Sequence, residues 1–165
     1  MPESATGSFD THTKGEKVEY THTNRGVIQY PQRSRQLVSF AGMRFTGNCS
    51  PTDIDMLVEY HDTVFVVYEY KLRGADMPRG QRTALTRIVD ALTKAGKHAA
   101  LFFCEHDVTD PREEINAAAA IVTRVYFCGR WYTGRGRTVA EQTTLFLHKF
   151  GQGAEIEPRY YANAN

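Results

Sequence analysis

The chain has 165 residues, 41% of them hydrophobic and 24% charged, with a formal net charge of +1. This size and composition are typical of one globular domain with a buried core. No stretch approaches the roughly 18 apolar residues of a membrane-spanning helix, and the polar N-terminus lacks the pattern of a secretory signal. Three scattered cysteines, Cys49, Cys104 and Cys128, fit reduced thiols better than disulfides or a zinc site. We therefore expect a cytoplasmic protein without a membrane partner.

The near-neutral net charge does not by itself indicate nucleic-acid binding. Arginines nevertheless gather in three clusters, and a local basic patch can bind phosphates when the total charge is small. Two interpretations stay open, contacts to nucleic acid and ordinary solvated surface charge. The clustered residues are Arg25, Arg33 and Arg35, then Arg79 and Arg82, then Arg130, Arg135 and Arg137.

The N-terminal third gives weak signals. Residues 1–15 have no periodicity and predict a disordered tail. A short helix over 32–37 is compatible with the breaks at Gly26 and Pro31, and residues 37–46 predict a strand before a turn at 47–51. We expect a single domain over 16–150 and a polar tail over 151–165.

The signal sharpens from Asp53. Residues 53–60 have the period-two pattern of a strand, in which Asp53, Asp55, Leu57 and Glu59 alternate with Ile54, Met56, Val58 and Tyr60. Residues 61–63 supply a tight turn. Residues 64–70 are apolar on both faces, as in a central strand that is covered on two sides.

A βαβ unit is predicted next. After a loop over 73–78, Leu85, Ile88, Val89 and Leu92 have the spacing of an amphipathic helix, which ends in a segment with lysines and a glycine at 94–97. Residues 99–104 then predict a second buried strand, parallel to the first.

The C-terminal part predicts a strand over 118–127, although its alanine run would also suit a helix. A turn at Gly129 and Arg130 would lead into a short strand at Trp131 and Tyr132. Thr138 and Glu141 match a capping box that opens a last helix, ending near residue 150. The predicted fold class is α/β, with a mixed central sheet of four to five strands flanked by helices.

Charged residues cluster where the two hairpin strands meet. A hairpin closing near residues 62–63 sets Asp55 across from Tyr70, and a change of one residue in the loop sets it opposite Glu69 or Lys71. Opposed residues lie about 5 Å apart, so two carboxylates and one ammonium are expected to converge. A structural alternative is a plain ion pair of Lys71 with Glu69 or Asp55, because buried charges are nearly always paired.

Residues 51–71, with Pro51, Asp55 and the Glu69-Tyr70-Lys71 triplet, resemble the signature of the PD-(D/E)XK nuclease superfamily. The resemblance covers residues 37–106, and Gln81 matches a glutamine that the superfamily often carries at the start of the next helix. Its own position on the apolar stripe also points Gln81 toward the sheet, where it needs a partner. The family frequently has an acidic residue on a first helix, for which this chain offers only Glu16 or Glu19.

This resemblance implies a restriction-endonuclease-like core and a nuclease that uses Mg²⁺ or Mn²⁺. Asp55, Glu69, Lys71 and Gln81 would be the catalytic residues, with Asp53 as the alternative to Asp55. Two carboxylates are a common Mg²⁺ ligand set, and the family adds the Tyr70 backbone carbonyl as a third ligand. Lys71 would orient the attacking water or stabilise the charged transition state.

Weaker signals surround this set. His106 ends a strand, the place where ligands of α/β sheets tend to bind, so it is a candidate accessory residue. An ordinary strand-end histidine is the preferred interpretation. The segment 134–137 offers arginines and glycines to a phosphate, or is a flexible basic loop. Trp131 and Tyr132 would suit stacking on a base or simple packing.

We thus expect a metal-dependent nuclease that hydrolyses DNA, as a structure-selective or junction-resolving enzyme of phage or prokaryotic origin. The small surface of the chain favours a homodimer. One alternative is an inactive module of the same fold that binds nucleic acid or a protein. Another is a structural phage protein in which Glu69 and Lys71 only pair with each other.

Overall fold

A computed structural model describes residues 51–152, together with Met43 and Thr46. These 102 consecutive residues belong to the compact unit Ser50–Asn165. They form an α/β fold with a five-stranded mixed sheet and two helices. The predicted N-terminal tail, the helix over 32–37, the strand over 37–46, and residues 153–165 lie outside the described part, apart from Met43 and Thr46. So do Arg25, Arg33, Arg35, Cys49, Glu16 and Glu19.

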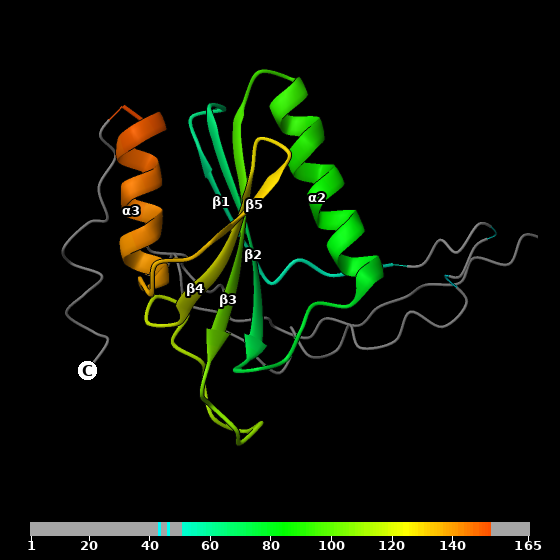
Figure 1. The fold of residues 1–165 in the computed structure, drawn as a ribbon, viewed down its shortest axis with the longest axis vertical. Helices are drawn as coiled ribbons and strands as arrows, with labels where there is room; N and C mark the ends of the chain where they lie inside the picture. Colours follow the sequence, from blue (N-terminus) through cyan, green and yellow to red (C-terminus); the bar gives the residue numbers. More distant parts are fainter. Residues whose placement is uncertain (1–42, 44–45, 47–50, 153–165) are drawn as a thin grey trace, which may run out of the picture. The chain divides into compact units, whose positions relative to one another are not determined.

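The described elements follow one another along the chain as predicted for a hairpin, a βαβ unit, a second hairpin and a final helix (Figure 1). Their bounds are β1 Met56–Tyr60, β2 Val64–Leu72, α2 Arg79–Lys94, β3 His98–His106, β4 Ile121–Phe127, β5 Arg130–Thr133 and α3 Val139–Phe150.

The strands lie in the order in which they occur in the chain, β1-β2-β3-β4-β5. β2 and β3 pair in parallel and are joined by α2, which confirms the predicted βαβ unit. All other neighbours pair antiparallel. Both central strands, β2 and β3, are buried along most of their length, because their apolar side chains alternate between two covered faces.

One face of the sheet packs against α3. Tyr68 and Phe102 from the central strands meet Phe146 of α3, and the rings of Phe102 and Phe146 stand edge to face with centroids 5.8 Å apart. The Tyr68 hydroxyl shares a hydrogen bond of 2.7 Å with Thr143 of the same helix. This satisfies two buried polar groups inside the larger apolar cluster.

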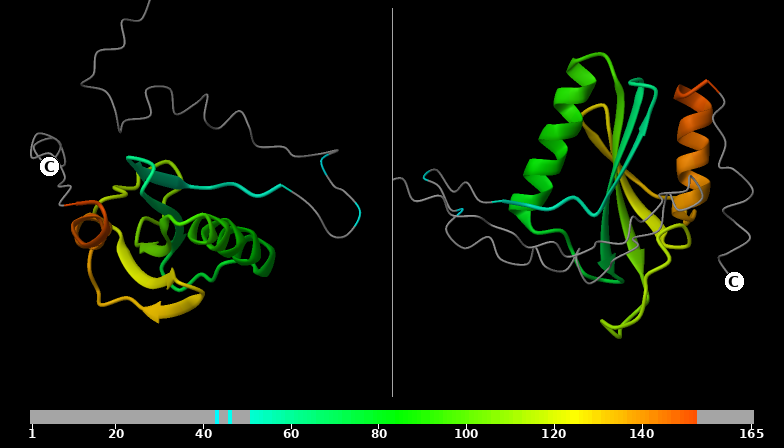
Figure 2. Two further views of the ribbon diagram at one scale, coloured as in Figure 1. Left: turned by 90° about the horizontal axis from the view of Figure 1, so that it is seen from above. Right: turned by 180° about the vertical axis from the view of Figure 1, so that it is seen from behind.

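The opposite face packs against α2, so that the sheet is sandwiched between two helices (Figure 2). Leu85 and Val89 are the buried residues of α2 and contact Leu101 and Phe103 of β3. Ile88, which the sequence pattern placed on the same stripe, is 37% exposed and lies at its margin. The buried stripe is therefore narrower than predicted.

Two predicted strands begin later than expected. β1 begins at Met56, not at Asp53, because the Asp55 carboxylate accepts the N–H group of Tyr70 where backbone pairing would have continued. β4 begins at Ile121, not at Ala118, because Asn116 accepts the N–H of Ala118 and turns the chain. In both places, a side chain competes with the backbone for hydrogen bonds.

The second hairpin turns one residue earlier than predicted. Cys128 and Gly129 both have positive φ, 50° and 75°, and Arg130 already belongs to β5. Two residues of positive φ between paired strands match the twist of a hairpin. The predicted capping box is confirmed, since Thr138 and Glu141 each accept the backbone N–H of the other.

The basic segment after β5 is held against the sheet at two points. Gly134 donates to the carbonyl of Thr123, and the carbonyl of Arg137 accepts from Val122. These bonds argue against a flexible loop. The backbone of β4 approaches Gly134 so closely that no side chain fits there, because a Cβ would lie 2.0 Å from the carbonyl oxygen of Val122.

Gly134→Ala is therefore expected to destabilise the protein by about 1–3 kcal/mol, the usual cost of overpacking. Gly80→Ala is the matched control, because a Cβ at Gly80 meets no atom within 4 Å. In a helix this second change should stabilise by about 0.5–1 kcal/mol. Urea unfolding measures both, and equal stability of the two variants would contradict the packing at Gly134.

No helix within residues 51–152 is long and apolar enough to cross a membrane.

Candidate active site

The candidate site lies on the α2 face of the sheet, where β1 begins and β2 ends. The β1–β2 register pairs Met56 with Tyr68, and its continuation by one residue sets Asp55 opposite Glu69. This is one of the two shifted registers considered from the sequence, and not the pairing with Tyr70. The Oδ2 atom of Asp55 accepts the Tyr70 N–H at 2.8 Å, which fixes this carboxylate at the end of the ladder.

Glu69 is the most unusual residue of this region, because its charged side chain is 0% exposed. It continues the row of apolar side chains that α2 covers, two residues after Val67. Its Oε2 atom accepts a hydrogen bond of 2.7 Å from Gln81. Its Oε1 atom forms an ion pair with the Lys71 ammonium, which donates to it. Because each carboxylate oxygen has two acceptor sites, Glu69 can accept further partners besides Gln81 and Lys71.

Lys71 reaches Glu69 along the same face, two residues further along β2. Its side chain is 28% exposed, so the ammonium lies at the boundary between the buried carboxylate and solvent. It also acts electrostatically on Asp55, where it partly offsets the rise in pKa that desolvation causes. The structure therefore brings Asp55, Glu69 and Lys71 together, as the spacing predicted.

Gln81 enters the site from the first turn of α2. Its Nε2 atom donates to Glu69 at 2.7 Å and to Oδ1 of Asp53 at 3.3 Å. The inward-facing glutamine thus has the partner that its position demanded. Because Gln81 donates to both Glu69 and Asp53, it fixes the buried carboxylate and connects the segment before β1 to α2.

Besides burial, the neighbouring Asp55 contributes to the raised pKa of Glu69. Burial raises the pKa of Glu69 most, the ion pair with Lys71 lowers it, and the nearby Asp55 raises it again. The pKa of Asp55 is also raised, because desolvation by neighbouring protein atoms outweighs the lowering effects of the Tyr70 N–H and of Lys71. A site that disfavours two neighbouring negative charges favours any additional cation between them.

The donor set suits a hard divalent cation. Within residues 51–152, no group of three His, Cys, Asp or Glu side chains is placed to hold a metal. Mg²⁺, however, usually takes only one or two carboxylates and keeps several waters. Asp55 and Glu69 provide two carboxylates, and each carboxylate oxygen can accept more than one partner. The residues present therefore fit Mg²⁺ or Mn²⁺.

Tyr70 is placed to add a backbone oxygen. In a strand, the N–H and C=O of one residue point to the same side. The Tyr70 N–H points toward Asp55, beyond the end of β1, so its carbonyl is expected on that side too. Its hydroxyl points elsewhere and donates to the carbonyl of Ala117.

His106 is not brought to this site. It pairs with Leu72 in the β2–β3 register, one position beyond the Lys71 pair, and so lies on the opposite face of the sheet from Glu69 and Lys71. Strand alternation explains this placement, because successive side chains point to opposite faces. The structure thus leaves His106 as a strand-end residue.

Glu105 is the acidic residue that the sequence interpretation passed over. It is the β3 partner of Lys71, on the same face, and its Oε1 lies 3.5 Å from the Thr123 hydroxyl. The sequence held a usable signal, because aligning β2 and β3 in parallel with their helix between them places residue 105 beside residue 71. Glu105 extends the polar row of the site toward β4.

The predicted basic residues fall in separate places. Arg79 begins α2, and Arg82 forms an ion pair with Asp76 in the loop between β2 and α2. Arg130 is exposed on the edge strand β5. Arg135 and Arg137 belong to the segment after β5. Of these five arginines, only Arg82 is adjacent in sequence to a residue of the candidate site, Gln81.

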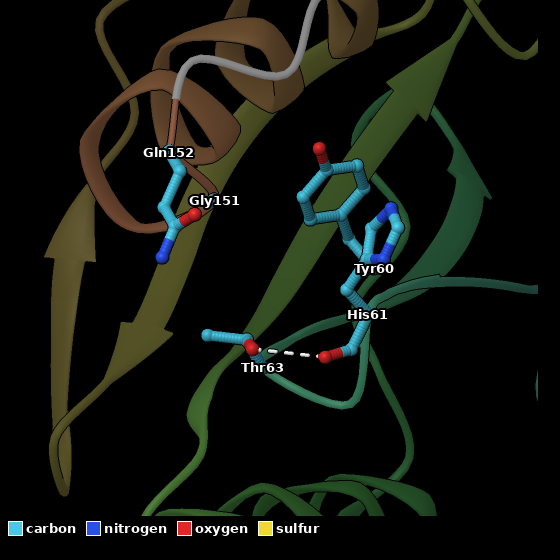
Figure 3. Close-up of a pocket in the computed structure, with 5 residues that line it drawn as sticks. All are labelled: Tyr60, His61, Thr63, Gly151 and Gln152. Carbon is cyan, nitrogen blue, oxygen red and sulfur yellow. Dashed lines mark hydrogen bonds between the residues drawn. The ribbon is translucent and has the colours of Figure 1, made fainter.

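Two pockets lie away from these residues. One, of about 270 Å³, is formed by the β1–β2 turn and the end of α3 (Figure 3). Tyr60, His61 and Thr63 line it together with Gly151 and Gln152. The other is lined by Arg137, Glu141, Thr144 and Leu145. Neither includes Asp55, Glu69 or Lys71.

Comparisons of the chain with models of protein families, with curated proteins and with solved structures found no match.

Proposed function

We propose that this chain is a nuclease that hydrolyses phosphodiester bonds of DNA with the help of Mg²⁺ or Mn²⁺. The observation that carries the proposal is the convergence of Asp55, Glu69 and Lys71, with Gln81 bonded to the buried acid. A buried ionised group is costly unless it is paired. A function that needs a charged, fixed carboxylate explains why Glu69 continues an otherwise apolar row.

Asp55 and Glu69 would hold the metal ion, with the Tyr70 carbonyl as an additional ligand. When bound, such an ion lowers the pKa of a coordinated water and offsets the negative charge of the phosphate. The chain itself contributes rigidity. The Tyr70 N–H holds Asp55 and the Gln81 amide holds Glu69, so both carboxylates are fixed before substrate arrives.

Lys71 has the second role. Its ammonium reaches the solvent boundary beside both acids, where the phosphate of a bound strand would lie. When a metal shares the charge of Glu69, the ammonium is available to the phosphate or to the attacking water. A fixed cation at that place stabilises the charge that develops in the transition state.

The proposal has three more specific parts. We propose that the fold is a restriction-endonuclease-like core, that the preferred substrate is a DNA junction, and that the protein acts as a homodimer. A homodimer would set two such sites side by side for two strands.

The test is incubation of the full chain with supercoiled, linear, single-stranded and four-way-junction DNA. Mg²⁺, Mn²⁺ and EDTA are compared for each substrate. We expect cleavage that needs the metal and stops with EDTA, and preferential cutting of the junction. An RNA strand of the same sequence tests whether cleavage requires deoxyribose.

Absence of cleavage with every DNA and both metals would overturn the proposal. Binding without cleavage would then favour the inactive module. Loss of binding as well would favour the structural protein, in which the Glu69–Lys71 ion pair has no catalytic use.

A further inference from the structure

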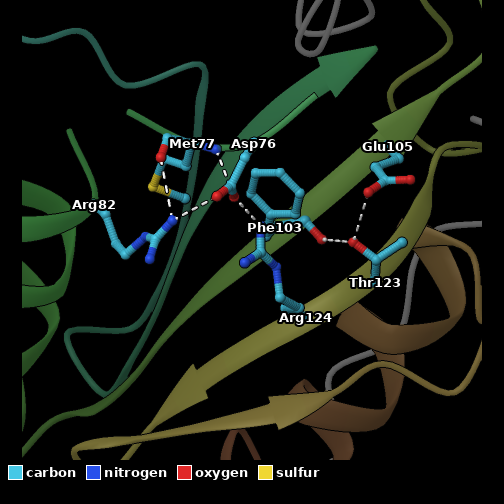
Figure 4. Close-up of polar contacts among 7 residues, drawn as sticks. All are labelled: Asp76, Met77, Arg82, Phe103, Glu105, Thr123 and Arg124. Carbon is cyan, nitrogen blue, oxygen red and sulfur yellow. Dashed lines mark hydrogen bonds and ion pairs between the residues drawn. The ribbon is translucent and has the colours of Figure 1, made fainter. Parts of the chain in front are cut away.

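The loop between β2 and α2 holds an ion-pair cluster beside the candidate site. Asp76 accepts from Arg82 of α2 at 2.8 Å and from Arg124 of β4 at 2.6 Å, through different oxygens (Figure 4). The three side chains come from three elements of the α2 side. The Asp76 side chain is 64% exposed, so two arginines converge on one carboxylate at the surface.

Arg124 lies in register with the buried acid. Glu69 pairs with Phe103 across β2 and β3, and Phe103 pairs with Arg124 across β3 and β4. Adjacent strands are about 4.8 Å apart, so the backbones at Glu69 and Arg124 lie roughly 10 Å apart. Both belong to one row on one face of the sheet. A strand whose phosphate lay at Glu69 would bring a neighbouring phosphate near Arg124.

Two aromatic rings support the Arg124 side chain. Its guanidinium lies over the Phe103 ring at 4.2 Å and 5.8 Å from the Trp131 ring. A register shift between Phe103 and Cys104 marks a β-bulge at this position, and the extra residue, Thr123, bonds to the Phe103 carbonyl. Bulges re-aim side chains next to functional sites. The bulge and the aromatic support fix the direction in which Arg124 points.

The arrangement has the chemistry of an anion site. A planar guanidinium binds carboxylate and phosphate oxygens with the same fork geometry. Arg124 first, and then the Met77 N–H, lower the pKa of Asp76 to about 2, so Asp76 is charged at any ordinary pH. Exposed ion pairs contribute little net stability, and a phosphate can therefore replace this carboxylate without disrupting the fold.

We propose that Arg82 and Arg124 bind a backbone phosphate of nucleic acid beside the phosphate that is cut, and that Asp76 occupies its place in the free protein. This inference rests on the proposed function, because it places the strand by Glu69. It adds Arg124, which no sequence pattern singled out, and gives Asp76 an inhibitory role.

A structural role for Asp76 predicts the opposite result. If its ion pairs served only to anchor the loop that joins Lys71 to Gln81, removing its charge would loosen the site and weaken both binding and cleavage. If Asp76 stands in for a phosphate, removing its charge releases two arginines and strengthens binding. The sign of the change therefore decides between them.

The experiment measures binding of the full chain to a short fluorescent DNA duplex, and to its single strand, in EDTA. We expect Asp76→Asn to bind about three- to tenfold more tightly than wild type, with a steeper salt dependence between about 50 and 200 mM NaCl. Asp62→Asn is the matched control. It makes the same charge change in an exposed pair with Lys97, at the other end of β2, and should leave affinity within about twofold.

Arg124→Gln is the complementary variant. We expect about three- to tenfold weaker binding and a salt slope lower by about one unit, as for the loss of one phosphate contact. Arg87→Gln, on the exposed side of α2, removes the same charge as its control. Thermal unfolding of each variant verifies that the fold is kept.

Unchanged or weaker binding by Asp76→Asn, or equal effects of Arg124→Gln and Arg87→Gln, would overturn the inference. Cleavage by wild type is measured separately with Mg²⁺. Cleavage by wild type with no tighter DNA binding by Asp76→Asn would retain the proposed function and reject the phosphate site. Tighter DNA binding by Asp76→Asn without any cleavage by wild type would retain the phosphate site and reject the proposed function.

Discussion

Lys71→Ala is expected to slow Mg²⁺-dependent DNA cleavage by about 100- to 1,000-fold, the usual loss when a fixed charge is removed from a transition state. The expectation follows from the position of the ammonium, in contact with Glu69 and at the solvent boundary. Single-turnover cleavage of the preferred DNA substrate measures the effect. Wild-type rates in this variant would show that the Lys71–Glu69 pair is only structural.

Two further lysine variants make this test specific. Lys71→Ala leaves the buried Glu69 without its ion pair, which itself destabilises the fold. Lys71→Gln keeps a hydrogen-bond donor for Glu69 but carries no charge, so it should fold and remain inactive. Lys94→Ala removes an exposed lysine from the last turn of α2, roughly 20 Å along the helix from Gln81, and should cleave like wild type.

Mg²⁺ is expected to stabilise the wild-type protein against unfolding, and Glu69→Gln should abolish most of this effect. A ligand at 100 times its Kd raises the free energy of unfolding by about 2.7 kcal/mol. Glutamine still accepts the Gln81 N–H but offers the ion no charge. Thermal unfolding with increasing Mg²⁺, and again in EDTA, measures the difference.

The metal-free behaviour of Glu69→Gln is a second readout. Burial raises the pKa of Glu69 in the folded protein, so the ionised side chain destabilises the fold. This penalty is fully present above the folded-state pKa and disappears below the unfolded-state value. At neutral pH and in EDTA, Glu69→Gln should therefore unfold no earlier than wild type.

Glu59→Gln is the control for both readouts, because Glu59 is an exposed acid on β1. It should keep the full Mg²⁺ effect. If Glu69→Gln responded to Mg²⁺ as strongly as Glu59→Gln, the ion would bind elsewhere.

The order of the elements could be predicted from the sequence because each has a strong local pattern. Residues 64–70 are apolar on both faces, Leu85 and Val89 recur at helical spacing, and Thr138 with Glu141 forms a capping box. Such signals depend on neighbouring residues alone. The two-residue spacing of Glu69 and Lys71 likewise placed them on one face before any tertiary contact was known.

The rest depended on register and on competition between side chain and backbone. Asp55 ends the β1 ladder by taking a backbone partner, which no alternation of residue types reveals. The bulge that directs Arg124 appears only when β3 and β4 are paired. The face to which His106 belongs needs the exact extent of β3, since a slip of one residue reverses it.

The central claim is that a divalent ion binds between the carboxylates of Asp55 and Glu69. The most direct measurement is the anomalous scattering of crystals of the full chain soaked in Mn²⁺. The claim predicts one strong peak in contact with both carboxylates and with the Tyr70 carbonyl oxygen. A map with no peak there, and with Lys71 still paired to Glu69 at saturating Mn²⁺, would contradict it.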